Sequence, residues 1–252
     1  MAITRQVPAP LRIVNARRRC VVKNPARGGG RWIEVAPERL VTWVDSFAAG
    51  HQGMRATVSP RGAKFTAGDG AVAECQVPFP PLPTTAGGAV GGEPGEAARL
   101  LAGHAAAGRT VGVLLVRLGG YAAGVFTGSP PRLAASKVGS RLVHGRSAAG
   151  GQSQQRFARR REKQAAEALA AAAGTAAAVL GPYRDRLQAV VLGGDRRAVD
   201  GLRGDPRLSP YFALATDRFL TVPDPRLAVL RDSPRLFRAI RIRLTEPPPP
   251  EG

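Results

Sequence analysis

The sequence predicts an α/β protein, with a mixed sheet and flanking helices, preceded by a small α+β unit. Short runs rich in β-branched residues alternate with helical stretches from residue 110 onward, which is typical of layered α/β folds. Residues 157–180 form the longest run of helix-forming residues in the chain. A Pro- and Gly-rich segment, residues 78–95, carries a single charged residue and separates the two parts.

The first part, residues 1–77, is expected to fold as the α+β unit. Residues 31–35 (RWIEV) read as a short strand, and Pro37 is well placed to begin a helix. That helix would present its apolar side chains on one face: Leu40, Val44 and Phe47. Further β-like runs follow up to residue 77, separated by turns at 60–62 and 68–70.

The rest of the chain divides into three segments in this interpretation. Residues 78–98 are expected to be a linker, because a segment so rich in Pro and Gly cannot bury a core. Residues 99–245 would form the second domain, with a hairpin signal at Gly119-Gly120 and a last strand in LFRAIRIRL. The Pro-rich tail, residues 246–252, is expected to be disordered.

The charge of the chain predicts a polyanionic partner. The formal net charge is +19 and the pI is about 11.6, and cations that neutralise phosphates also release counterions. Only four of the 37 basic residues are lysine, and Ala, Gly and Pro are abundant. Part of the arginine content is therefore typical of a GC-rich genome, so the sign of the charge is more informative than its size.

Cysteine and histidine usage predicts neither a metal nor a cofactor. Cys20 and Cys75 lie far apart and outside any CxxC pattern, which excludes a disulfide framework and a Cys-rich zinc site. No two histidines have metal-ligand spacing. No apolar run reaches transmembrane length in the sequence, so we expect a cytoplasmic protein without a membrane partner.

A local excess of cations marks residues 137–163. The span holds one acid, Glu162, and eight basic residues: Lys137, Arg141, Arg146, Arg156, Arg159, Arg160, Arg161 and Lys163. Several of these fall at the N-terminal end of the predicted long helix, where the helix dipole is also positive. Both effects would attract phosphate to the start of the helix.

A glycine- and glutamine-rich segment, residues 148–155 (AAGGQSQQ), is expected to form a loop at that helix start. It contains no carboxylate, thiol or imidazole, so it cannot supply the usual general acid or base. A glutamine amide can instead hold a water or hydroxyl in line for attack, or support an oxyanion. The same composition is also typical of a flexible polar loop ahead of a solvated basic helix, and short Gly-rich motifs are more often such loops.

The segment KVGSRLVHGRSAAGGQSQQRFARRREKQ, residues 137–164, resembles the actinobacterial release-factor-like peptidyl-tRNA hydrolases. These are relatives of the eukaryotic ankyrin-repeat and zinc-finger peptidyl-tRNA hydrolase and, more distantly, of the class I eukaryotic release factor. Residues 31–51 and 110–126 also look like that family. The resemblance implies a core similar to the release-factor middle domain, an RNase H-like layer fold.

The resemblance also implies which residues form the site. The family's Gly-x-x-Gln signature matches Gly151 to Gln154, which makes Gln154 the catalytic residue and Gly150, Gly151 and Ser153 the loop hinge. Gly150-Gly151-Gln152 is also a literal Gly-Gly-Gln, so Gln152 is a rival. The implied RNA-binding residues are Arg141, Arg146, Arg156, Arg159, Arg160, Arg161 and Lys163.

The implied function is release of nascent chains from stalled large ribosomal subunits, with peptidyl-tRNA and large-subunit rRNA as partners. Two chemistries fit: hydrolysis of the peptidyl-tRNA ester by a positioned water, or cleavage of the tRNA acceptor end at a phosphodiester, with Arg146 or Arg156 as the cation. The charge alone also fits a non-catalytic ribosome- or RNA-binding module, or a metal-free nuclease acting on free tRNA.

Overall fold

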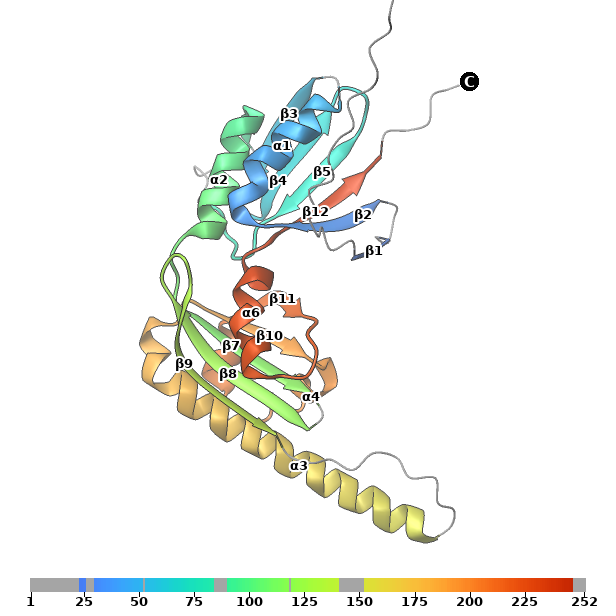
Figure 1. The fold of residues 1–252 in the computed structure, drawn as a ribbon, viewed down its shortest axis with the longest axis vertical. Helices are drawn as coiled ribbons and strands as arrows, with labels where there is room; N and C mark the ends of the chain where they lie inside the picture. Colours follow the sequence, from blue (N-terminus) through green and yellow to red (C-terminus); the bar gives the residue numbers. More distant parts are fainter. Residues whose placement is uncertain are drawn as a thin grey trace, which may run out of the picture.

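The protein folds into two lobes, each built on its own β-sheet, and a long helix extends from the second lobe (Figure 1). The computed structural model describes residues 23–25, 30–51, 53–83, 90–117, 119–140 and 152–246. The predicted α/β fold with a mixed sheet is confirmed, since the second sheet contains both parallel and antiparallel pairs.

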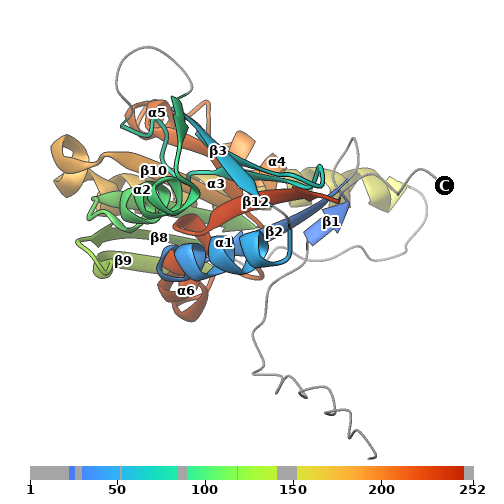
Figure 2. The same ribbon diagram turned by 90° about the horizontal axis from the view of Figure 1, so that it is seen from above.

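The first lobe contains a seven-stranded antiparallel sheet with both of its helices on one face (Figures 1 and 2). The strand order is β1 (Lys23–Pro25), β2 (Arg31–Val35), β12 (Ile240–Thr245), β5 (Val72–Gln76), β4 (Gly62–Ala67), β3 (Met54–Ser59) and β6 (Val90–Gly92). The helices are α1 (Leu40–Ala49), which follows the 3-10 turn η1 (Pro37–Arg39), and α2 (Pro94–Ala106). Alternate strand residues such as Ile33, Phe65 and Ile242 are buried beneath them, as expected for a sheet covered on one side.

The second lobe contains a five-stranded mixed sheet with helices on both faces. The strand order is β11 (Ala215–Leu220), β10 (Ala189–Gly194), β7 (Val111–Arg117), β8 (Gly120–Thr127) and β9 (Arg132–Ser140), with the first three parallel. One face packs against α3 (Gln152–Leu180), η2 (Gly181–Arg186), α4 (Arg196–Asp200) and α5 (Ser209–Ala213). The other face packs against α6 (Leu227–Phe237).

The boundary between the lobes differs from the expected division of the chain. The last strand, β12, pairs with β2 and β5 of the first sheet, so residues 240–245, which were expected to belong to the second domain, are part of the first lobe. The alternation of Ile240, Ile242 and Leu244 predicts a strand, but it carries no information about which sheet that strand joins. The expected linker, 78–98, is partly core: Phe79 is buried in the second lobe, Leu82 in the first, and α2 starts within it.

The apolar half of α3 packs against one face of the second sheet. Residues Glu162–Arg186 are long and apolar enough to cross a membrane by length and composition alone. Ala172, Ala173, Ala176 and Leu180 are nevertheless buried against the sheet, which is the arrangement of a core helix in a layered fold.

Candidate active site

The candidate glutamines lie in the first turn of α3. The helix begins at Gln152, so Gln152, Ser153 and Gln154 are helical residues. The sequence had predicted a loop at these positions. Gln is a good helix former and nothing after Gly151 interrupts the helix, whereas the sequence prediction started the helix at Phe157 and assigned the glutamines to the Gly-rich loop before it. The expected hinge residues Gly150 and Gly151 lie outside the described residues, as do Arg141 and Arg146.

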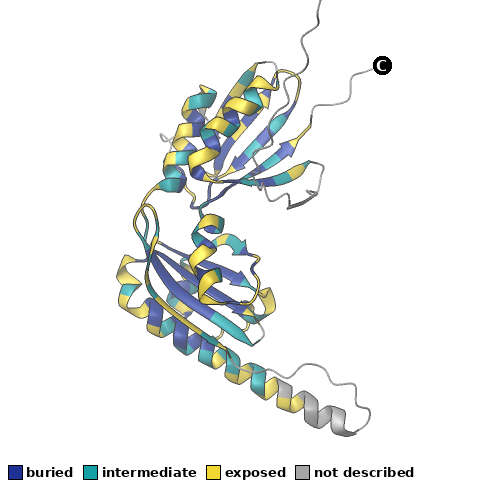
Figure 3. Ribbon diagram, in the orientation of Figure 1, coloured by how far each residue is buried: buried dark blue, intermediate teal, exposed yellow. Residues whose placement is uncertain are grey.

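The N-terminal half of α3 extends beyond the sheet into solvent (Figure 3). Among the side chains described along the helix, Ala172 is the first that is buried. Gln154 precedes Ala172 by 18 positions, which is about 27 Å at the rise of an α-helix. The fold therefore holds the helix start well away from both lobes while keeping it attached to a packed core.

The exposed half of α3 carries the predicted cations. Arg159, Arg160 and Lys163 are exposed. Arg156 and Arg161 are also in the helix, but their side chains lie outside the description. The first turn contains no acidic residue, so the positive end of the helix dipole is not offset there.

Helical periodicity separates the two glutamine positions. Position 152 is about two turns before Arg159 and about three turns before Lys163, which places it on the exposed basic side of the helix. Position 154 is about five turns before Ala172, so it continues the side that packs on the sheet further along. Two residues two positions apart are on nearly opposite sides of a helix, so positions 152 and 154 belong to different faces of α3.

A known protein family matches the part of the chain that contains α3. The model of the Actinobacteria/chloroflexi VLRF1 release factor family matches residues 109–243, more than half of the chain. The chain belongs to this release-factor family. The match runs from β7 into β12 and includes the whole of α3, which confirms the resemblance predicted from residues 137–164.

Solved structures of translation factors resemble the fold at very low sequence identity. The archaeal translation termination factor aRF1 is 11% identical with a TM-score of 0.40, over 81% of this chain and 73% of that chain. Pelota from Archaeoglobus fulgidus is 12% identical with a TM-score of 0.30, over 88% and 68%. Dom34 from S. cerevisiae, described as a translation termination-like factor, is 9% identical with a TM-score of 0.27, over 85% and 66%. No curated protein matches the chain.

Two histidines and a cysteine described elsewhere in the chain are buried or hold neighbouring segments together. His51 Nδ1 lies 2.6 Å from Asp69 Oδ2 and joins the end of α1 to the β4–β5 turn. The ring of His104 lies 2.6 Å from the Phe79 carbonyl, and burial lowers its pKa. Burial also raises the pKa of the Cys75 thiol. Within the described ranges, no three His, Cys, Asp or Glu side chains are grouped so as to hold a metal ion.

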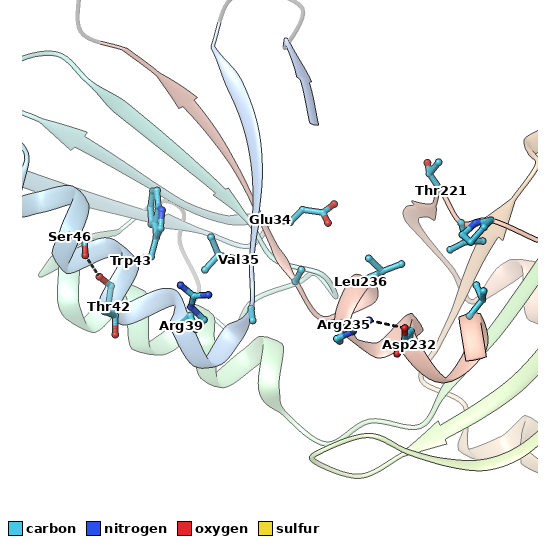
Figure 4. A pocket seen from close by; sticks show the side chains of 15 residues that line it. Glu34, Val35, Arg39, Thr42, Trp43, Ser46, Thr221, Asp232, Arg235 and Leu236 are labelled. Atoms are coloured by element: carbon cyan, nitrogen blue, oxygen red, sulfur yellow. Dashed lines mark hydrogen bonds and ion pairs between the residues drawn. The ribbon is translucent and has the colours of Figure 1, made fainter. Parts of the chain in front are cut away.

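A groove between the lobes is a feature that the sequence did not indicate. Its volume is about 770 Å³, and it lies between α1 and β2 on one side and α6 with the segment after β11 on the other (Figure 4). Its walls include Trp43, stacked on Phe47 at 5.5 Å, and the Asp232–Arg235 ion pair at 2.8 Å. Residues nearly 200 positions apart form it, so no local pattern could have indicated it.

Proposed function

We propose that this release factor frees nascent chains from peptidyl-tRNA on stalled large ribosomal subunits in the cytoplasm, by ester hydrolysis. A glutamine in the first turn of α3 would position the attacking water. Membership of a release-factor family supports the general role. The observation that carries the specific proposal is the position of these glutamines, about 27 Å from the first buried turn of the same helix.

Such a reach suits a target enclosed by RNA. A single α-helix is about 10–12 Å wide with its side chains, so its exposed end can enter a space that neither lobe could enter. The exposed Arg159, Arg160 and Lys163 would contact phosphates behind the tip, and the helix dipole would add to their attraction. The lobes would remain outside and set the direction of approach.

The proposed step requires no charged side chain at the tip. The amide oxygen of Gln154 or Gln152 accepts a hydrogen bond from a water molecule and directs its oxygen at the ester carbonyl carbon. Attack forms a tetrahedral oxyanion, the ester bond to the tRNA ribose breaks, and the water's proton passes to the departing ribose oxygen. The products are a peptide carboxylic acid and a tRNA with an intact terminal ribose.

The family signature and the helix favour different glutamines. The Gly-x-x-Gln pattern assigns Gln154, whereas helical periodicity aligns Gln152 with Arg159 and Lys163 on the exposed basic side. A catalytic amide that depends on cations for delivery would lie on their side of the helix. A catalytic amide positioned by other contacts at the helix start would not need to.

The test is peptide release from purified large-subunit–peptidyl-tRNA complexes by Gln152→Ala and Gln154→Ala, with Gln155→Ala as the control. Gln155 is an amide in the same turn and the same helix. We expect one of the first two variants to lose release by about 100-fold or more, the effect of removing a group that supports the transition state directly. If both variants release peptide at the rate of the control, the proposal is wrong.

The 3′ end of the released tRNA identifies the chemistry. Ester hydrolysis leaves the complete acceptor end, whereas phosphodiester cleavage leaves a shortened tRNA and a peptide that still carries nucleotides. If the released tRNA is shortened, the reaction is acceptor-end cleavage and not ester hydrolysis. Salt-sensitive ribosome binding without any release would leave only the non-catalytic binding module, and cleavage of free tRNA would indicate a nuclease.

A further inference from the structure

The first sheet has one face that neither of its helices covers. Both α1 and α2 lie on the opposite face, where the buried residues of the lobe are found (Figure 1). The uncovered face, called here the open face, carries the alternate residues of five neighbouring strands. They are Trp32, Glu34, Arg55, Thr57, Ser59, Lys64, Thr66, Val72, Glu74, Gln76, Arg241, Arg243 and Thr245.

The register of the sheet arranges one row of these residues across all five strands. Trp32 is opposite Arg243, Arg243 is opposite Glu74, Glu74 is opposite Lys64, and Lys64 is opposite Thr57. Four inter-strand steps separate the ends of the row, a span of about 19 Å. An aromatic ring therefore stands at one end of a row whose interior carries two cations.

The aromatic ring is already part of a stacked pair. The guanidinium carbon of Arg241 lies 4.8 Å from the centroid of the Trp32 ring, and the indole is only partly buried. Both the indole and the guanidinium are flat surfaces on which nucleic-acid bases stack. A base that joined this pair would cover Arg241 or take its place on the indole, and either change would alter the environment of Trp32.

The charges of the open face suit a polyanion better than an apolar partner. Four cations, Arg55, Lys64, Arg241 and Arg243, face two acids, and one of these, Glu74, lies 3.7 Å from Arg243. The large apolar side chains exposed on the described part of the protein are all on the second lobe or α2: Leu100, Val138 and Leu227. An interface with a folded protein would instead be expected to have an apolar centre.

We propose that the open face binds single-stranded RNA, with a base stacked on the Trp32–Arg241 pair and phosphates contacted by Lys64, Arg55 and Arg243. Recognition of unpaired RNA by stacking on a sheet with flanking cations follows from the chemistry of bases, which all present a flat π-face. This proposal concerns the first lobe alone, and it does not depend on whether α3 acts on peptidyl-tRNA.

The fluorescence of Trp32 provides a local measurement. The chain has two tryptophans, and Trp43 is in α1 and lines the groove, so Trp43→Phe leaves Trp32 as the sole reporter. The full chain carrying this change is titrated with a short single-stranded oligouridylate, and separately with the same sequence in a duplex. We expect saturable quenching by the single strand and much weaker quenching by the duplex, whose bases cannot stack on the protein.

Two charge variants in the Trp43→Phe background test the phosphate contacts. Arg55→Gln with Lys64→Gln removes two exposed cations from the open face, and Arg99→Gln with Arg184→Gln removes two exposed cations from elsewhere. We expect only the first pair to lower the slope of log affinity against log salt, by about 1.4, or 0.7 for each single-strand phosphate contact. A third variant in the same background, Arg159→Gln with Arg160→Gln on α3, should leave the quenching of Trp32 unchanged.

Three results would overturn the proposal. The first is RNA binding, seen by anisotropy of a labelled strand, with no change in Trp32 fluorescence. The second is an equal fall in slope for both charge variants, which would indicate a general charge effect. The third is equal quenching by single strand and duplex, which would exclude stacking of a base on Trp32. None of these outcomes bears on whether α3 releases peptide, so the two proposals fail separately.

Discussion

The guanidinium of Arg218 donates a hydrogen bond to the carbonyl of Leu236, with 2.9 Å between the two atoms. It also donates to the carbonyls of Phe237 and Ala239. These carbonyls are at the end of α6, where the chain leaves the second lobe to form β12 of the first. A cation at this position satisfies carbonyls that a helix end leaves without partners and interacts favourably with the helix dipole.

Replacing Arg218 should therefore loosen the crossing between the lobes. Burial lowers its pKa to about 10, so the guanidinium remains charged at neutral pH. Arg218→Met would leave buried carbonyls unpaired, and we expect the free energy of unfolding to fall by about 2 kcal/mol. Urea unfolding measures this, with the exposed Arg231→Met of α6 as the control, expected within about 0.5 kcal/mol of wild type. Equal stability of the two variants would show that Arg218 does not secure the crossing.

The exposed cations of α3 should govern the salt dependence of ribosome binding. Arg159→Gln with Arg160→Gln is expected to lower the slope of log affinity against log salt by about 2, one for each lost phosphate contact. Arg184→Gln with Arg197→Gln removes the same charge from exposed positions of the second lobe and should leave the slope nearly unchanged. The measurement is co-sedimentation with large subunits over a salt series. A similar change in both variants would mean that α3 has no special role in binding.

The sequence indicated most elements of the fold but not how they combine. The apolar run from Val111 identified β7, and the Ala-rich stretch identified α3, because both signals are local. The partner of β12 depends on contacts between residues some 200 positions apart, such as Arg241 with Glu34, and no local period encodes them. The start of α3 was expected at Phe157, later than the observed Gln152, because the glutamines follow two glycines and were assigned with them to a loop.

The extent of the candidate site was likewise only partly predictable. The basic residues and the glutamines could be identified by their types and spacing. The reach of the helix could not, because the sequence does not state where the sheet beneath α3 ends. The strands β8 and β9 contact α3, and Ala172 and Ala176 are buried in the core that α3 shares with this sheet. The open face and the groove required the sheet register and the path of β12.

The His51–Asp69 pair should make the first lobe sensitive to acid. The hydrogen bond with His51 is the main cause that lowers the pKa of Asp69, and the amide of Ala71 also donates to this carboxylate at 3.0 Å. A carboxyl whose pKa is depressed on folding adds stability above its unfolded pKa of about 3.9, and that contribution is lost as the pH falls through the folded pKa. In His51→Ala the Asp69 pKa, followed by NMR titration, should rise toward its ordinary value. An unchanged Asp69 pKa would contradict this account.

The reach of α3 should matter for release as much as the glutamines themselves. Ala166 is exposed and precedes the first described buried residue of the helix, Ala172. In Ala166→Pro the ring would clash with the carbonyl four residues earlier and kink the helix, at a cost of about 3 kcal/mol borne by its exposed half. Ala166→Gly should cost only about 1 kcal/mol and leave the helix straight.

We expect the proline variant to lose most peptide release. Urea unfolding of the two lobes should stay close to that of the glycine variant, because no buried side chain is displaced. Retained release in the proline variant would show that the tip acts without a straight helix behind it, and the distance from Gln154 to the packed core would then have no role in the reaction.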